Sequence, residues 1–312
     1  MNKILNGDCL EVMKGLKSES INCCTTSPPY WGLRDYGAEG QLGLEKTAKA
    51  YVDKLVEIFR EVRRILRDDG TLWLNLGDSY AGSMKGIGHD GNAYAGEKQD
   101  TNKGSVGIYK EKPPSAQSIG LKPKDLVGIP WMVAFALRAD GWYLRSDIIW
   151  HKPNAMPESV KDRPTKAHEY IFLLSKSKKY YYDYEAIKEP AKWERWGNQT
   201  EKKKHPGKAA HLGGKKIEEL PVSDKKNKRT VWAVPTKPFK EAHFATYPPD
   251  LIEPCILAGC PEGGIVLDPF MGAGTTAMVT LQNRRRYIGV EINPEYVEIA
   301  ERRLAAVQMK IL

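Results

Sequence analysis

Residues 264–291 constrain the fold more than any other stretch, because they read as strand, glycine-bearing turn, helix, strand and acid. The apolar run 264–268 predicts a short buried strand, and the strand predicted at 286–291 ends in Glu291. Gly272 and Gly274 lie in the turn between them, where glycine lets a ligand approach the backbone. In open α/β sheets, ligands bind beyond the carboxyl ends of the strands. The stretch therefore predicts an α/β unit that binds a nucleoside, with the acid on the ribose hydroxyls.

The turn at residues 269–276 also limits which nucleoside ligand fits. It lacks the full G-x-G-x-x-G of dinucleotide-binding turns, and no Gly-Lys-Ser or Gly-Lys-Thr follows, which excludes a P-loop. Asp268 ends the preceding strand, and a carboxylate there suits an ammonium group better than a pyrophosphate. A ligand that combines an ammonium, a ribose and an adenine is S-adenosylmethionine.

A second feature is a strand that is stopped by two prolines, at Thr26-Ser27-Pro28-Pro29-Tyr30. Proline fixes φ and lacks an N–H, so the β-prone run 21–26 must end there in a stiff turn. A hydroxyl and a carbonyl of this turn can accept both hydrogens of an exocyclic amine, while the aromatic ring stacks on a planar base. An ordinary Pro-Pro turn beside a core tyrosine is the alternative on these residues alone.

The remaining chain predicts alternating helices and strands. Residues 1–30 read as strand, helix, strand, and Asp8 follows the first strand, where a helix N-cap and a ligand contact are both open. A clean amphipathic helix at 47–67 is expected to close at the acidic turn 68–70. Periodicity predicts further helices at 131–138, 248–258, 277–282 and 294–305, further strands at 71–78, 142–150 and 169–174, and a strand at 178–184 that pairs with the last of these.

Length and composition narrow the class of protein. With 312 residues and 41% hydrophobic residues, the chain can bury a large core in one or two domains. No window has the roughly 18 apolar residues of a membrane span, and the N-terminus lacks a basic-then-apolar signal, so a cytoplasmic protein with no membrane partner is expected. The five cysteines form no Cys-x-x-Cys pair, so we expect neither a disulfide framework nor a metal site.

The net charge of +9 favours a polyanionic partner, and most of it is local. Residues 190–230 hold twelve Lys or Arg and five Asp or Glu, a net of +7. Trp193 and Trp196 lie among these basic residues, where they either stack beside phosphate contacts or pack on the main domain. The glycine-rich stretch 81–120 predicts a mobile loop near the substrate, with plain disorder as the alternative.

Together, the two motifs resemble those of the DNA amino-methyltransferases, which make N4-methylcytosine or N6-methyladenine. That family combines a (D/N/S)-P-P-(Y/F/W) tetrapeptide with a D-P-F-x-G-x-G-T cofactor motif. Residues 27–30 match the first motif and residues 268–275 match the second. Residues 150–157 and 243–249 are similar to the family segments beside the flipped base and at the methionine end of the cofactor. The catalytic motif comes first, which is similar to the permuted beta arrangement of the family.

The resemblance implies the fold and its division. The expected fold class is α/β, a Rossmann-like S-adenosylmethionine-dependent methyltransferase sheet that is circularly permuted and carries an inserted target-recognition region. The catalytic half would span 1–184, including the loop 81–120. The basic insertion 185–230 would recognise the target, and 231–312 would form the cofactor-binding half. The implied partner is double-stranded DNA, and a homodimer is an open expectation because members of this arrangement are often dimers.

The resemblance also implies a role for each matching residue. Tyr30 would stack on a flipped-out base, whose amine would be held by Ser27 Oγ and the Pro28 carbonyl. The implied catalytic residues are Ser27, Pro28, Pro29 and Tyr30. Asp8 and Glu291 would hold adenine and ribose, and Asp268 the methionine ammonium. The implied cofactor-binding residues are Asp8, Thr26, Phe244, Thr246, Asp268, Pro269, Phe270, Gly272, Gly274, Thr275 and Glu291. The implied DNA-binding residues are His151, Lys152, Arg163, Trp193 and Trp196.

The Ser form of the tetrapeptide goes more often with cytosine N4 in this family, so we expect a DNA (cytosine-N4)-methyltransferase, with adenine N6 as the alternative. Cytosine-C5 methylation needs a cysteine nucleophile after a proline. Pro254-Cys255 supplies that dipeptide, but it lies in an apolar helical run, where a packed thiol is expected. An RNA or protein methyltransferase and a non-catalytic nucleic-acid-binding protein are further alternatives. The permuted motif order and the basic insertion argue against the first, and the intact motifs at 27–30 and 268–276 argue against the second.

Overall fold

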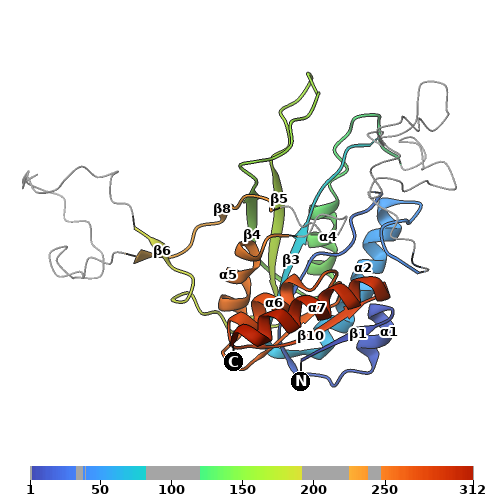
Figure 1. Cartoon of the computed structure of the whole chain (residues 1–312). Helices are drawn as coiled ribbons and strands as arrows, with labels where there is room; N and C mark the ends of the chain where they lie inside the picture. Colours follow the sequence, from blue (N-terminus) through green and yellow to red (C-terminus); the bar gives the residue numbers. More distant parts are fainter. Residues whose placement is uncertain are drawn as a thin grey trace, which may run out of the picture.

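The computed structural model describes residues 2–32, 38, 40–81, 120–191, 225–237 and 247–311. Within these ranges, eight strands form one sheet that has helices on both faces (Figure 1). Most of the loop predicted at 81–120 and most of the basic insertion lie outside the described residues. None of the helices in the described ranges is long and apolar enough to cross a membrane.

The strand order of the sheet places the two ends of the chain side by side. From one edge to the other, the strands are β1 (Lys3–Asn6), β10 (Arg286–Glu291), β9 (Ile265–Asp268), β2 (Ile21–Thr26), β3 (Leu66–Leu76), β5 (His168–Ser175), β4 (Tyr143–His151) and β8 (Val231–Ala233). The late strands β9 and β10 thus lie between the early strands β1 and β2. This interleaving agrees with the circular permutation that the motif order predicts.

Strand direction decides which residues meet at each edge. The pairs from β1 through β3 are all parallel, whereas β5 is antiparallel to both β3 and β4. Because two reversals restore the direction, β4 runs the same way as β1, β10, β9, β2 and β3, and β8 runs parallel to β4. The carboxyl ends of these strands therefore share one edge with the start of β5.

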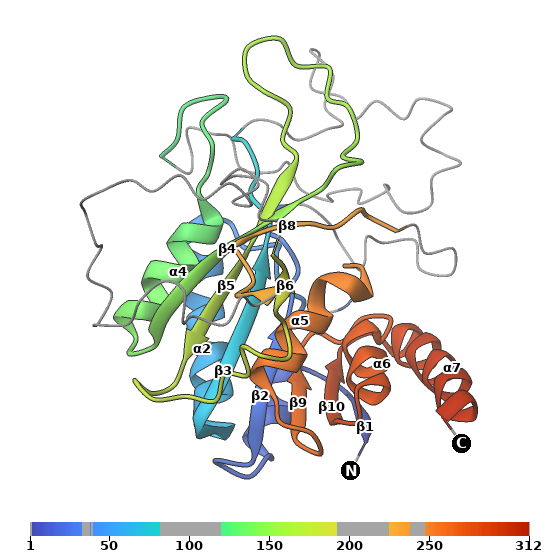
Figure 2. The same ribbon diagram turned by 90° about the vertical axis from the view of Figure 1, so that its left-hand side faces the viewer.

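Two helical layers cover the sheet (Figure 2). One face carries α2 (Ala48–Ile65) and α4 (Ile129–Ala139), with α1 (Cys9–Lys14) packed against α2. The other face carries α5 (Pro249–Gly259), α6 (Thr275–Gln282) and α7 (Pro294–Ile311). The helix α2 begins at the Thr47 cap, whose hydroxyl accepts the Ala50 N–H at 3.1 Å. Its apolar stripe, which includes Tyr51, Leu55 and Phe59, is fully buried against the sheet. Each face of the sheet therefore has its own hydrophobic core.

Two of the predicted elements are wrong. The predicted acidic turn at 68–70 is part of β3, which starts directly after α2 because Leu66 pairs with Ile21 across an irregular register. Residues 178–184 form no strand, because both edges of β5 are already paired with β3 and β4. Instead, that segment crosses the sheet end, where the Tyr181 N–H donates to the Asp69 carbonyl at 2.9 Å.

The two ends of the basic insertion pair with each other in a separate two-stranded sheet. Glu189–Pro190 (β6) pairs antiparallel with Lys225–Lys226 (β7), and Glu189 forms ion pairs with Lys226 and Arg229. The chain then enters β8, where Trp232 is buried. The insertion therefore leaves and rejoins the described structure at one place.

Close packing between α5 and the sheet gives a stability prediction for Gly259. A Cβ at this residue would lie 2.5 Å from Trp73 Nε1 and 2.7 Å from Thr71 Oγ1, and both side chains are fully buried. We expect Gly259→Ala to lower the free energy of unfolding by about 1–3 kcal/mol, as overpacking does. Urea denaturation measures the change. Gly15→Ala is the matched control, because its Cβ would have only the Val12 carbonyl oxygen nearby, at 3.5 Å, and equal losses in both variants would contradict the prediction.

Candidate active site

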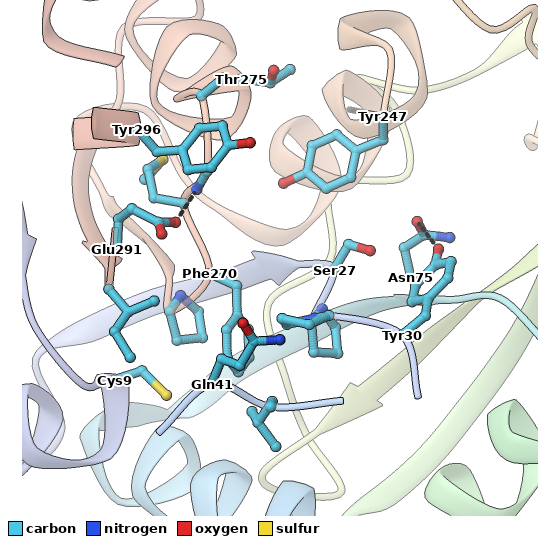
Figure 3. A pocket seen from close by; sticks show the side chains of 18 of the residues that line it. Cys9, Ser27, Tyr30, Gln41, Asn75, Tyr247, Phe270, Thr275, Glu291 and Tyr296 are labelled. Atoms are coloured by element: carbon cyan, nitrogen blue, oxygen red, sulfur yellow. Dashed lines mark hydrogen bonds between the residues drawn. The ribbon is translucent and has the colours of Figure 1, made fainter. Parts of the chain in front are cut away.

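A cavity of about 690 Å³ opens at the edge where the parallel strands end. Its size is typical of a small-molecule site. Both halves of the chain line it, with Asp8 after β1, Ser27 after β2, Phe270 after β9 and Glu291 at the end of β10. In Figure 3, Glu291 and Cys9 lie toward one end and Tyr30 and Asn75 toward the other, with Phe270 and Ser27 between them. The strand order thus brings together two motifs that lie some 240 residues apart in the sequence.

A fully buried carboxylate holds the two motifs in place. Asp268 Oδ1 accepts the Thr26 hydroxyl at 2.6 Å and the Phe270 N–H at 3.0 Å. Asp268 Oδ2 accepts the Tyr247 hydroxyl at 2.9 Å and the Thr276 hydroxyl at 2.5 Å. Burial raises the pKa of Asp268, and the four hydrogen bonds oppose that rise. The carboxylate therefore ties the end of β2, the glycine turn, α6 and the segment before α5 to one point.

Asp268 itself does not line the cavity, and its side chain is fully buried. A carboxylate has about four acceptor positions, and the four protein donors fill them. The sequence predicts that Asp268 binds the methionine ammonium, but this environment suits a positioning residue instead. Thr26 is likewise buried and does not line the cavity. Among the residues that bond Asp268, Tyr247 and Phe270 line the cavity.

The glycine turn and Glu291 shape the end of the cavity where the sequence predicts the cofactor. The Gly272 N–H donates to Glu291 Oε2 at 2.8 Å, and the Asn293 N–H donates to Oε1 at 2.9 Å, so each oxygen keeps one acceptor position (Figure 3). Burial raises the pKa of Glu291, although the two N–H groups oppose the rise. Gly272 and Thr275 line the cavity as predicted, but Gly274 does not. A Cβ on Gly274 would lie 2.8 Å from the Ala300 Cβ, so this glycine serves the packing of α6 on α7.

Asp8 combines the two roles that the sequence leaves open. Its side chain caps α1 by accepting the Glu11 N–H at 3.0 Å, and it also lines the cavity. Apolar side chains form the walls between Asp8 and Glu291. They are Cys9, Leu10, Leu42, Ile58, Pro269, Phe270 and Ile292.

The Pro-Pro turn lines the middle of the cavity, with all four residues 27–30 on its wall. The Tyr51 hydroxyl donates to the Pro29 carbonyl at 2.8 Å, so that carbonyl is used within the fold. No hydrogen bond between described residues uses the Pro28 carbonyl. The Tyr30 ring packs directly on Gly77, where a Cβ would lie 2.5 Å from Tyr30 Cε2. The Ser27 hydroxyl, the Pro28 carbonyl, to which no described residue donates, and the Tyr30 ring therefore lie on the same wall.

The sequence reasoning missed a polar cluster beyond Tyr30. The Tyr30 hydroxyl donates to Glu169 Oε2 at 2.6 Å, and Glu169 Oε1 forms an ion pair with Lys152. Asn75 Nδ2 donates to Glu169 Oε2 at 3.3 Å and to the Tyr170 carbonyl at 3.1 Å. Burial, and then the charge of Glu169, raise the pKa of Tyr30 well above its usual value, which keeps the phenol protonated. The only sequence signal for Glu169 is a carboxylate at the start of an apolar strand. The sequence does not show that β5 runs antiparallel, and this direction is what places Glu169 at the same sheet edge as Tyr30.

The predicted DNA-binding residues are not gathered at one place. Lys152 lines the cavity, whereas His151 does not and is exposed at the end of β4. Arg163 stacks on Tyr80, 3.9 Å from the ring centroid, and pairs with Glu158 at 2.5 Å. Trp193 and Trp196 lie outside the described residues, as do Phe244 and Thr246 of the predicted cofactor site.

Cys255 is a packed thiol, as predicted. Its side chain is buried, and burial raises its pKa well above the usual value. The thiolate that a cysteine nucleophile needs is therefore disfavoured. Within the described ranges, no three His, Cys, Asp or Glu side chains gather as metal ligands would.

Comparison with known proteins identifies the family. The family model described as DNA methylase matches residues 21–302. The chain is 50% identical over 302 residues to the type II methyltransferase M.SmaI of Serratia marcescens, covering 97% of this chain and 90% of that protein. It is 48% identical over 301 residues to M.Cfr9I of Citrobacter freundii, covering 96% and 87%.

Solved structures share the fold. The PvuII DNA methyltransferase (cytosine-N4-specific) superposes with a TM-score of 0.62 at 19% identity, covering 100% of this chain and 93% of that chain. TTHA0409 of Thermus thermophilus, complexed with S-adenosyl-L-methionine, gives a TM-score of 0.59 at 22% identity, covering 98% and 94%. The Rossmann-like methyltransferase fold predicted from the sequence is confirmed.

The chain belongs to the DNA methylase family and is a site-specific DNA amino-methyltransferase. Its methyl donor is S-adenosylmethionine, as the sequence predicts. The cavity fits this molecule. It presents carboxylates at two strand ends, an apolar wall between them and a glycine turn that lets the ligand approach the backbone.

The four bonds to Asp268 predict that a change of one atom disrupts the site. Asp268→Asn keeps one acceptor oxygen, so two of the four buried donors lose their acceptor. We expect the free energy of unfolding to fall by about 2–3 kcal/mol. We also expect weaker S-adenosylmethionine binding, because Tyr247 and Phe270 line the cavity. Urea denaturation and calorimetry measure the two effects.

Asp8→Asn is the matched control for stability, because Asn caps a helix about as well as Asp. It should leave the free energy of unfolding unchanged. A stable Asp268→Asn variant with wild-type cofactor affinity would show that the carboxylate does not organise the site.

Proposed function

We propose that the enzyme transfers the methyl group to the exocyclic N4 of a cytosine that is flipped out of double-stranded DNA. The observation that carries the proposal is the set of Ser27, the unused Pro28 carbonyl and the fixed Tyr30 ring on one cavity wall. The Ser form of the tetrapeptide favours cytosine over adenine. The cytosine-N4 specificity named for the PvuII enzyme is consistent with this choice.

In the proposed mechanism, positioning supplies most of the rate. Ser27 Oγ and the Pro28 carbonyl accept the two amine hydrogens and turn the nitrogen lone pair toward the cofactor end of the cavity. Tyr30 stacks on the base, and its contacts with Gly77 and Glu169 fix the plane of its ring. When bound, S-adenosylmethionine would supply an electrophilic methyl group. The N–CH3 bond would form as the S–CH3 bond breaks, S-adenosylhomocysteine would be the leaving group, and one amine proton would pass to solvent. A base in a duplex cannot reach this wall, so the target must leave the stack.

For the cofactor, we propose that Glu291 holds the ribose and that Asp8 holds the adenine. Pro269, Phe270, Gly272 and Thr275 complete this end of the cavity. Phe244 and Thr246 retain their predicted place at the methionine end. Asp268 and Thr26 act from behind the wall by holding Tyr247 and the glycine turn.

On the DNA side, we propose that residues 185–230 recognise the target sequence and that Trp193 and Trp196 contact DNA. His151 and Arg163 contribute positive charge beside the cavity. The curated relatives are type II methyltransferases, so we propose that this enzyme protects DNA from a partner restriction endonuclease. A homodimer is the proposed assembly.

Identification of the product tests the target base. The protein is incubated with mixed-sequence DNA and S-adenosylmethionine, and the DNA is digested to nucleosides for mass spectrometry. The expected product is N4-methylcytosine. If the product is N6-methyladenine, the enzyme class stands but the proposed target base is wrong. If the product is C5-methylcytosine, the proposed mechanism is wrong.

The Ser27→Ala variant tests whether the Ser27 hydroxyl accepts a hydrogen bond from the target amine. Because one acceptor of the amine is lost, we expect kcat to fall roughly 10²- to 10³-fold, as when a transition-state hydrogen bond is removed. Cofactor affinity measured by calorimetry should not change. Ser20→Ala is the control, since the Ser20 hydroxyl only donates to the Lys17 carbonyl at 2.6 Å, outside the cavity. Wild-type kcat in Ser27→Ala would contradict the assigned role.

The raised pKa of Glu291 predicts the pH dependence of cofactor binding. Ribose hydroxyls donate to the ionised carboxylate, so affinity should fall as the pH drops through this pKa, which lies above the value of about 4.3 for an ordinary Glu. The Glu291→Gln variant should bind S-adenosylmethionine more weakly, and its affinity should no longer fall as the pH drops through this range. Calorimetric titrations of folded protein over a pH series measure both. Glu295→Gln, at an exposed position on α7, is the control that should keep this pH dependence.

A further inference from the structure

An ion pair lies where the cavity meets the Pro-Pro turn. Lys152 and Glu169 are in direct contact, and both side chains are mostly buried, with 21% and 14% of their surfaces exposed. Both also line the cavity. Removing two charges from water is costly, and a buried pair contributes little to stability on average. The position of this pair in the cavity therefore suggests a role in binding.

Lys152 is held at a fixed position by its surroundings. Its ammonium lies 4.2 Å from the centroid of the Trp150 ring, which is buried, as well as against Glu169. The backbone around it is also fixed, since the Lys152 N–H donates to the Ala167 carbonyl at 2.8 Å and Asn154 bonds Thr236 at 2.9 and 3.0 Å. Among the residues that the structure describes, Lys152 Nζ has no other hydrogen-bond acceptor. An ammonium has three N–H groups, so donor capacity remains for a ligand.

We propose that Lys152 reads the edge of the flipped base and selects cytosine, with Glu169 as the residue that positions it. This inference rests on the proposed function, because it takes the amine to lie at Ser27 and Pro28 and the ring to lie on Tyr30. The Tyr30 hydroxyl and Lys152 bind the two oxygens of the same carboxylate. A base stacked on Tyr30 therefore has one edge within reach of the ammonium.

Base chemistry makes this contact selective. Next to its amine, cytosine presents N3 and then O2, which are both hydrogen-bond acceptors. Adenine presents N1 and then a C–H group at the corresponding place. A cation that donates at the second position binds cytosine and leaves its donor unpaired against adenine. Sites built to hydrogen-bond a substrate group reject an analogue without it far better than an apolar pocket does.

Glu169 explains why a lysine in this cavity does not simply bind a phosphate. The carboxylate neutralises the ammonium, so the pair offers directed N–H donors with little net charge to attract a polyanion. Glu169 also fixes Tyr30 and Asn75 through Oε2. Glu169 therefore positions both the Tyr30 ring and the Lys152 ammonium, so a shift of one of these groups also moves the other.

The test compares DNA with and without the target base. The methylated site is first located by single-molecule sequencing of plasmid DNA treated with the wild-type enzyme. Affinities are then measured by fluorescence anisotropy with S-adenosylhomocysteine for two duplexes that carry that site. One duplex has the intact cytosine and the other has an abasic position in its place. A group that reads the base should matter only for the first duplex.

The informative variant is Lys152→Met with Glu169→Gln, because it removes both charges and leaves no unpaired carboxylate in the cavity. Its reference is the wild-type enzyme, whose Lys152–Glu169 ion pair also carries little net charge. In the double variant, the amide oxygen that replaces the carboxylate still accepts the Tyr30 hydroxyl. We expect the double variant to bind the cytosine duplex about 10- to 100-fold more weakly than this reference, as for the loss of a charge-assisted hydrogen bond. Its affinity for the abasic duplex should equal that of the reference.

Lys161→Met is the control for a phosphate contact, because Lys161 is an exposed lysine on the same β4–β5 loop and lies outside the cavity. The Lys161→Met variant should lower the affinity for both duplexes equally, or change neither affinity. If the double variant also weakens both duplexes equally, or neither, Lys152 does not read the base and the inference is overturned alone. If the wild-type product is N6-methyladenine, the proposed base and this inference both fail, and the product analysis separates that case.

Discussion

The four hydrogen bonds to Asp268 are the interaction on which the site depends. A permuted chain supplies its catalytic turn and its cofactor turn from opposite ends, so the two must be joined at one point. A fully buried carboxylate can do this because its two oxygens accept from four separate segments at once. Burial disfavours the charge and raises the pKa, and only a complete set of donors compensates for it. The residue that looks most like a ligand contact in the sequence is thus the one that assembles the wall.

Strand direction accounts for the other end of the cavity. If β5 were parallel to its neighbours, Glu169 would start at the opposite edge of the sheet, far from Tyr30. Its reversal places the first residues of β5 beside the last residues of β3 and β4, where Asn75, Trp150 and Lys152 lie. The parallel strands β1, β10 and β9 thus supply the end of the cavity around Glu291, and the antiparallel strand adds Glu169 beside the Tyr30 ring.

Much of the architecture could be predicted from the sequence, because buried strands and amphipathic helices have distinct periodicities. The strand 286–291 and the helix at 248–258 are found within a residue or so of their predicted ends. The start of β3 could not be predicted, since the exposed Asp68 and Asp69 look like a turn until the pairing of Leu66 with Ile21 is known. In the site, the local motifs correctly indicated that residues 27–30, Gly272 and Glu291 line one cavity. Glu169 and Asn75 were not indicated, because their role depends on pairing between strands about ninety residues apart.

Charge is distributed in this enzyme according to what each surface must bind. Strong positive charge is concentrated in residues 190–230, whose sequence suits a long-range attraction to DNA. Inside the cavity, by contrast, Lys152 is paired with Glu169, and the raised pKa of Tyr30 keeps its phenol neutral. A cavity with an unpaired cation would favour phosphates, which are far more abundant on DNA than any one base. In the proposed mechanism, neutralising the cation next to Tyr30 favours a neutral base over the backbone, and leaves discrimination between bases to the direction of the remaining N–H groups.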